Sequence, residues 1–167
     1  MINLRKIVIT TDLSGFSLAA LEFASSLGLL FTSKLYLLYV SEEVPVILPT
    51  LHGLETDTEG LRHRIARDAA DDLKSFMKLS VNPDLNLIPV VRNGHASDEI
   101  IAFAKEEGVD LIVMATHGRT GFQHVLLGSI AEKIVRNSPV PVLTVKPASV
   151  RDPIIKNEDV ESELHIR

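Results

Sequence analysis

The stretch that decides the fold runs from residue 110 to residue 146 and reads DLIVMATHGRTGFQHVLLGSIAEKIVRNSPVPVLTVK. It begins with an apolar run, Asp110–Ala115, of the kind that forms a strand covered on both faces. A loop with glycines follows at 116–127, and a helix is then predicted over Gly128–Asn137, where Ser138-Pro139 stops it. Another strand is predicted over Val142–Val145. A strand, a crossover helix and a second strand are typical of a parallel sheet.

The same alternation of strand and helix signals continues through the rest of the chain. Strands are predicted over Lys6–Thr11, Leu35–Val40 and Leu85–Val91, and helices over 14–31, 61–79 and a segment that His95 and Ser97 cap and Gly108 ends. Pro89 lacks a backbone donor, which favours an edge position for the third strand. Five strands separated by helices predict an α/β fold, a single-domain, doubly wound parallel sheet with right-handed crossovers.

The helix over 14–31 carries apolar residues at spacings of three and four. The set predicted to face the core is Phe16, Ala20, Phe23, Ala24, Leu27 and Phe31. We expect the folded domain to span residues 1–147. Residues 148–167 change in composition and are expected to form a tail that is mobile or packs on a partner subunit.

Composition excludes several functional classes. The chain has 167 residues, 17 Lys and Arg against 22 Asp and Glu, and no cysteine. A net charge of −5 without a basic cluster argues against a nucleic-acid partner, because such binding needs clustered cations. The lack of cysteine excludes disulfides and thiolate metal sites. No apolar run is long enough to span a bilayer, so we expect no membrane partner and a cytoplasmic location.

Ligands of doubly wound sheets bind beyond the carboxyl ends of the strands, where strand order reverses. This rule directs attention to the segments Thr10–Ser14 and Met114–Ser129. Gly128-Ser129 opens a helix, whose free N–H groups and dipole favour a phosphate group. The same residues also fit a plain capping box, Ser129-x-x-Glu132, and the residues alone leave these two interpretations equally open.

Residues 110–146, the opening KIVITTDLS and the strand LYLLYV resemble the universal stress protein family over about residues 3–147. The resemblance implies a Rossmann-like sheet of the adenine nucleotide alpha hydrolase type, with strand order 3-2-1-4-5. The nucleotide-binding branch of the family has the pattern G-x-x-G, nine residues, then G-[S/T]. Gly118 and Gly128-Ser129 fit this pattern, while Ala115 occupies the position of its first glycine. The resemblance therefore implies ATP as the ligand, with Mg²⁺ or Mn²⁺ held mostly by phosphate oxygens and water.

The resemblance also implies a set of binding residues. Asp12 would lie near the nucleoside, Val40 would meet the adenine through its backbone, and Gly118 would face phosphate. The full set is Thr10, Thr11, Asp12, Val40, Met114, Ala115, Gly118, Gly128, Ser129, Ile130 and Ala131.

The residues do not present a catalytic set or a metal site. Ser14 and Ser17 lack an evident base, and His117 lacks a second ligand at metal-binding spacing. The leading hypothesis is an ATP-binding, dimeric stress-response regulator with little or no turnover, paired through the last strand as the resemblance implies. The alternatives are a partner-binding module of the same fold without nucleotide, and a slow nucleotide hydrolase.

Overall fold

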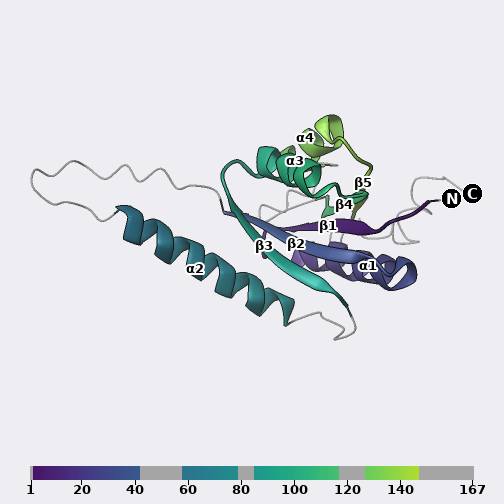
Figure 1. Cartoon of the computed structure of the whole chain (residues 1–167). Coiled ribbons are helices and arrows are strands. Elements are labelled where there is room, and N and C mark those ends of the chain that lie inside the picture. Colours follow the sequence, from purple (N-terminus) through teal and green to yellow (C-terminus); the bar gives the residue numbers. More distant parts are fainter. Residues whose placement is uncertain (1, 42–57, 79–84, 117–126, 147–167) are drawn as a thin grey trace, which may run out of the picture.

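The computed structural model describes residues 2–41, 58–78, 85–116 and 127–146 (Figure 1). Strands and helices alternate along the chain, as the hydrophobic pattern predicts. In chain order the elements are β1 (Lys6–Thr11), α1 (Gly15–Phe31), β2 (Lys34–Ser41), α2 (Thr58–Met77), β3 (Leu87–Asn93), α3 (Ala96–Glu107), β4 (Leu111–Ala115), α4 (Ser129–Asn137) and β5 (Val142–Val145).

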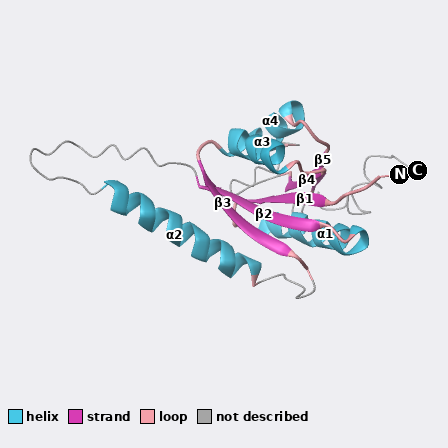
Figure 2. Cartoon of the chain, viewed as in Figure 1, coloured by secondary structure: helices cyan, strands magenta, loops and turns pink. Residues whose placement is uncertain are grey.

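The strands form one parallel sheet in the order β3-β2-β1-β4-β5, which confirms the predicted fold (Figure 2). The chain proceeds outward from β1 to β3 and then returns to place β4 on the other side of β1. Strand order therefore reverses between β1 and β4. At this point the helices that follow the two strands lie on opposite faces of the sheet, and doubly wound sheets bind ligands at such reversal points.

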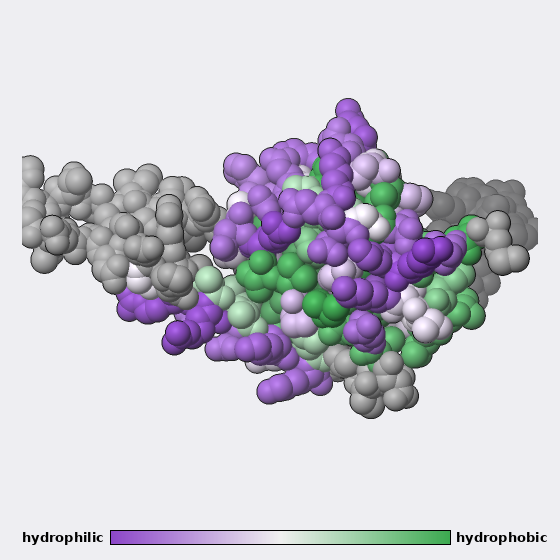
Figure 3. All heavy atoms as spheres, viewed as in Figure 1, coloured by the Kyte–Doolittle hydropathy of each residue, from purple (hydrophilic) through white to green (hydrophobic). Residues whose placement is uncertain are grey.

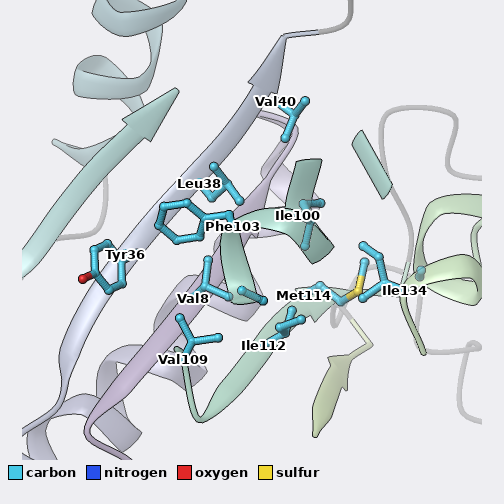
Figure 4. Packing of buried hydrophobic residues seen from close by; sticks show 12 residues of the cluster. Val8, Tyr36, Leu38, Val40, Ile100, Phe103, Val109, Ile112, Met114 and Ile134 are labelled. Carbon is cyan, nitrogen blue, oxygen red and sulfur yellow. The ribbon is translucent and has the colours of Figure 1, made fainter. Parts of the chain in front are cut away.

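Each face of the sheet is covered by one pair of helices. Alternate side chains of a strand point to opposite faces, and β1 divides accordingly. Ile7 and Ile9 pack with α1 and α2, whereas Val8 packs with α3 and α4 (Figure 4). The central strands are buried on both sides, which explains why β1 and β4 are continuous apolar runs. Figure 3 shows apolar side chains still visible near β2 and β3, where Ile88 and Val90 are only partly buried.

The face that α1 buries differs in part from the prediction. Its buried residues are small or slender: Ser17, Ala20, Leu21, Ala24 and Gly28. Phe23, predicted to face the core, is 48% exposed. A Cβ at Gly28 would lie 2.7 Å from Leu35 Cδ1, so the helix sits too close to β2 for larger side chains along this line.

The boundaries of two elements differ from the predictions by a few residues. β3 begins at Leu87 rather than Leu85, because Leu87 N donates to the Leu85 carbonyl at 2.9 Å in a turn. β3 is nevertheless an edge strand, as Pro89 predicts. The helix predicted over 61–79 is α2, which begins earlier, at Thr58, and ends at Met77.

The ends of α3 bear out one prediction and correct another. Gly108 ends the helix in the left-handed conformation, as predicted. His95 occupies the position that precedes the helix, but its side chain makes no capping hydrogen bond. Ser97 lies within the first turn, with its Oγ 3.3 Å from Asp98 Oδ1, so the prediction that it caps α3 is wrong, whereas His95 is the N-cap residue and its carbonyl accepts the amides of Asp98 and Glu99.

Candidate functional site

The end of β4 is joined directly to the beginning of α4. Thr116 N donates to the Val145 carbonyl at 3.0 Å, which holds it to β5. Gly128 N donates to the Thr116 carbonyl at 2.8 Å. The first residues of α4 therefore lie beside the carboxyl end of β4, next to the point where strand order reverses.

Glycine fits position 128 because the backbone of Thr116 lies close to it, and not because its backbone angles are unusual. Its φ is −64°, which any residue adopts. A Cβ added there would lie 3.3 Å from the Thr116 carbonyl oxygen, a tight contact with backbone. Glycine at this position thus lets the two segments meet.

The beginning of α4 has no side-chain cap among the residues that the structure describes. Gly128 precedes the helix, and the first intrahelical bond is from Glu132 N to the Gly128 carbonyl at 2.9 Å. The amides of Ser129, Ile130 and Ala131 precede this bond, and none donates to another described residue. The capping box predicted as the alternative is wrong, because Ser129 is already inside the helix. Its partner Glu132 instead forms an ion pair with Arg136 at 3.0 Å.

These three amides point the positive end of the helix toward the carboxyl end of the sheet. The Ser129 and Ile130 side chains are exposed, whereas Ala131 is buried against the sheet. Three adjacent N–H donors and a hydroxyl at a helix terminus match the needs of a phosphate group.

The end of β1 forms a tight turn around Asp12. Asp12 Oδ1 accepts hydrogen bonds from Ser14 N at 3.1 Å and from Ser14 Oγ at 2.6 Å. Leu13, between them, has a φ of 64°, in the left-handed region that leucine rarely adopts. Thr10 and Thr11 precede the turn, and both are buried.

A second set of hydrogen bonds ties this turn to α1. Thr11 Oγ1 lies 2.8 Å from Ser17 Oγ and accepts the amide of Leu13 at 2.9 Å. Ser17 Oγ donates to the Ser14 carbonyl at 2.8 Å. The Thr11 hydroxyl is therefore bonded within the fold.

The predicted binding residues divide between the two faces of the sheet. Val40, Met114 and Ala131 share one buried cluster on the α3–α4 side (Figure 4). The alternation of β1 places Thr10 on that side too. Ala115, in contrast, packs in the cluster on the α1–α2 side. The methyl group that replaces a glycine hydrogen at position 115 thus points away from Met114 and Ala131.

Three residues outside the predicted binding set also shape this region: Ser14, Ser17 and Thr116. The serine two residues after Asp12 was a readable signal, because Asx turns use this spacing, whereas no such signal marked the contacts of Ser17. Nothing in the sequence marked Thr116, whose role depends on its backbone. Gly118, His117 and Arg119 lie outside the described residues.

The described residues provide neither a metal-binding cluster nor a membrane-spanning helix. They include no group of three or more His, Asp or Glu side chains that could hold a metal ion. None of the helices in the described part of the chain has the length and apolar character to cross a membrane.

Known proteins match this chain over nearly its whole length. Residues 3–146 match the model of the universal stress protein family. The universal stress protein MJ0531 of Methanocaldococcus jannaschii is 35% identical over 143 residues, which cover 85% of this chain and 82% of the relative. MJ0577 of the same organism is 28% identical over 153 residues, covering 85% of this chain and 94% of the relative.

Solved structures agree with the fold. The structure of MJ0577 superposes with a TM-score of 0.72 at 28% identity, covering 87% of this chain and 97% of the other. A universal stress protein in complex with cAMP superposes with a TM-score of 0.55 at 23% identity, covering 86% of this chain and 98% of the other.

Proposed function

We propose that this chain, which belongs to the universal stress protein family, binds ATP at the carboxyl ends of β1 and β4 and acts as a dimeric, nucleotide-responsive regulator. The observation that carries the proposal is the beginning of α4, where the first three amides have no acceptor among the described residues. The amides of Ser129, Ile130 and Ala131 and the Ser129 hydroxyl would receive the phosphates, with Gly118 completing that end. Mg²⁺ or Mn²⁺ would bind mainly to phosphate oxygens and water.

The nucleoside would lie on the α3–α4 side of the reversal point. Val40 and Met114 are the next-to-last residues of β2 and β4 and would present backbone atoms to it, beside Thr10 and Asp12. Thr11 would contribute through its backbone, because its hydroxyl is bonded to Ser17. The solved relative that holds cAMP speaks for the fold alone at 23% identity, so the proposal rests on the residues of this chain.

The substitution of Ala115 for the first glycine of the family pattern is compatible with this site. Its side chain packs with the α1–α2 cluster, on the face opposite Met114 and Ala131. The extra methyl group therefore does not project among the side chains on the nucleoside side. This placement favours ATP binding over a partner-binding module without nucleotide.

We infer little or no turnover at this site. Asp12 is the carboxylate at the end of β1 that could act as a general base, but its Oδ1 already accepts two hydrogen bonds from Ser14. A group that shapes the turn in this way is poorly placed to activate water as a general base. Slow ATP hydrolysis that persists after stringent purification of the protein and is lost in Asp12→Ala would favour the hydrolase alternative.

We propose that two copies of the chain pair through the outer edges of their β5 strands. We also propose that the protein acts in the cytoplasm. β5 is the last strand of the sheet, and its Pro141 and Val145 carbonyls accept bonds from the β4 side. The intervening residues Val142 and Thr144 thus direct their N–H groups outward. Thr144→Pro removes one outward donor, so sedimentation should show a dimer for the wild type and a Thr144→Val control but a monomer for Thr144→Pro. A wild-type monomer would refute this part.

ATP binding is tested by a substitution that should have opposite effects on stability and on affinity. Ser129→Asp places a negative charge at the positive end of α4, which should raise the free energy of unfolding by about 0.3–1 kcal/mol. The same charge repels phosphate, and we expect calorimetry to show ATP affinity about 30-fold weaker, equivalent to about 2 kcal/mol.

The matched control is Asn137→Asp, which adds the same charge at the other end of the same helix. Its ATP affinity should stay at the wild-type value. Equal affinity for all three proteins would remove α4 from the site. A wild type that neither binds ATP nor carries any nucleotide detectable by mass spectrometry after mild extraction would favour the partner-binding alternative.

A further inference from the structure

The turn after β1 contains a chain of hydrogen bonds whose hydroxyl protons can be assigned. Ser17 Oγ donates to the Ser14 carbonyl, and a serine hydroxyl has a single proton. In the contact between Thr11 Oγ1 and Ser17 Oγ, Thr11 is therefore the donor. Thr11 Oγ1 in turn accepts the Leu13 amide. The bonds thus run in one direction, from Leu13 N–H through Thr11 and Ser17 to the Ser14 carbonyl.

These hydrogen bonds are connected to Asp12 through Ser14. The Ser17 amide also donates to the Ser14 carbonyl, at 3.1 Å, so that carbonyl is held twice. The amide and the hydroxyl of Ser14 both bind Asp12 Oδ1. The position of the carboxylate therefore depends on Ser14, and the position of Ser14 depends on Ser17 and Thr11.

Burial makes these bonds hard to replace. Thr11 and Ser17 are 8% and 3% exposed, so water has little access if either hydroxyl is removed. The Leu13 amide would lose its acceptor in a chain without the Thr11 hydroxyl. Leu13 also has a backbone conformation that disfavours leucine, and such strain persists only where the surroundings impose it.

We propose that Thr11 and Ser17 are positioning residues for the nucleoside, which hold the turn of residues 12–14 so that the Asp12 carboxylate meets its ligand in one orientation. This inference rests on the proposed function, since it specifies how the same site fixes its nucleotide. Neither hydroxyl touches the nucleotide, because each is bonded inside the fold on the α1 side.

The test compares ATP with inorganic triphosphate, which has no nucleoside and depends only on the phosphate end of the site. In Thr11→Val and in Ser17→Ala, calorimetry should show ATP affinity about tenfold weaker, the effect of one lost hydrogen bond at the site. Affinity for inorganic triphosphate should be that of the wild type. Thr11→Ser keeps the hydroxyl and should restore ATP affinity, which a general loss of packing at this position would not allow.

A double-mutant cycle identifies the group through which Thr11 acts. If Thr11 positions Asp12, then adding Thr11→Val to Asp12→Ala should weaken ATP binding no further. Leu13→Gly accepts the left-handed conformation without the help of Thr11, and should recover part of the ATP affinity in the Thr11→Val background.

The outcomes separate this inference from the function on which it rests. A wild type that fails to bind ATP overturns the proposed function and the positioning role with it. A wild type that binds ATP, alongside Thr11→Val and Ser17→Ala variants that bind it equally well, overturns the positioning role alone. So do additive effects in the cycle, or equal losses for ATP and inorganic triphosphate. If Thr11→Val fails to fold, Ser17→Ala decides by the same comparison.

Discussion

The amino end of the sheet and the beginning of α4, at the carboxyl end, differ in whether their polar groups have hydrogen-bond partners. At the amino end, Asp110 Oδ2 accepts the amides of Arg5 and Lys6 at 2.7 and 2.9 Å. Lys6 Nζ donates to the Glu107 carbonyl at 2.5 Å, and Tyr36 Oη donates to Glu107 Oε2 at 2.6 Å. At the carboxyl end, three amides of α4 have no acceptor among the described residues.

At the amino end, side chains accept hydrogen bonds from the backbone and thereby stabilise the fold. At the start of α4, the backbone N–H groups remain available to a ligand. The amino end places long charged side chains, with Lys34 Nζ also 4.8 Å from the centroid of the Tyr36 ring, to satisfy its own groups. At the carboxyl end, Gly128 precedes α4, which begins with Ser129, Ile130 and Ala131, and no described side chain accepts a hydrogen bond from the first amides of the helix. Substitutions at the amino end should therefore change stability alone, and those at the carboxyl end should change ligand binding.

The largest stability effect is expected for Asp110→Ala. The Arg5 and Lys6 amides would lose a charged acceptor, which should lower the free energy of unfolding by about 2 kcal/mol. Urea unfolding measures this loss, with Asp110→Asn as an intermediate because its amide oxygen still accepts. ATP affinity should not change, whereas Asp12→Ala should weaken it about tenfold and should also lower stability, because Asp12 Oδ1 accepts two hydrogen bonds from Ser14. Weakened ATP binding in Asp110→Ala would contradict the division between the two ends.

A smaller effect is expected for Gly128→Ala. The added Cβ would lie 3.3 Å from the Thr116 carbonyl oxygen, so the bond between Gly128 and Thr116 should lengthen slightly. We expect a loss of about 0.5–1 kcal/mol in stability and an ATP affinity reduced about three- to fivefold, since the α4 amides shift with it. Gly15→Ala, where no atom lies within 4 Å of the added Cβ, controls for the change in backbone entropy. Unchanged ATP affinity in Gly128→Ala would contradict the inference that the contact between Gly128 and Thr116 positions the α4 amides for ATP.

The smallest effect concerns pH. The Tyr36 hydroxyl, with help from Lys6 and Lys34, holds the pKa of the Glu107 carboxyl below its ordinary value. The stabilisation is complete above the ordinary carboxyl pKa and is lost as pH falls through the lowered pKa of the folded state. Tyr36→Phe removes the main cause, so its free energy of unfolding should fall less steeply between neutral and acid pH.

Urea midpoints measured across this pH range would test the expectation, with Tyr39→Phe as the control. Tyr39 packs on the α1–α2 side and does not contact Glu107 in the described structure. Equal pH dependence in the wild type and Tyr36→Phe would show that the tyrosine does not control this carboxyl group.

Sequence patterns predicted the larger features of the fold because those features follow from local preferences. Apolar runs placed β1 and β5 with their observed bounds, and Pro89 marked the edge strand. Positions that depend on the distance between elements were predicted less well. Phe23 fits the helical period, yet it is 48% exposed, because α1 packs on the sheet through the face that carries Leu21, Ala24 and Gly28.

The candidate site shows the same limit. Gly128-Ser129 could be placed at the start of a helix by inspection, but a capping box and an open phosphate site use the same residue types. The choice between them depended on which residue precedes the helix, and helix boundaries cannot be read to one residue from sequence.

The order of apolar runs and breakers by itself determined the alternating α/β architecture, because strand and helix periods are local properties of the chain. Only the tertiary structure decided that the first amides of α4 have no acceptor within the described part of the chain, that Ala115 faces away from Met114, and that Thr11 and Ser17 bond to the turn that holds Asp12. These features depend on contacts between residues on different elements and on single backbone angles, and local sequence preferences do not specify either.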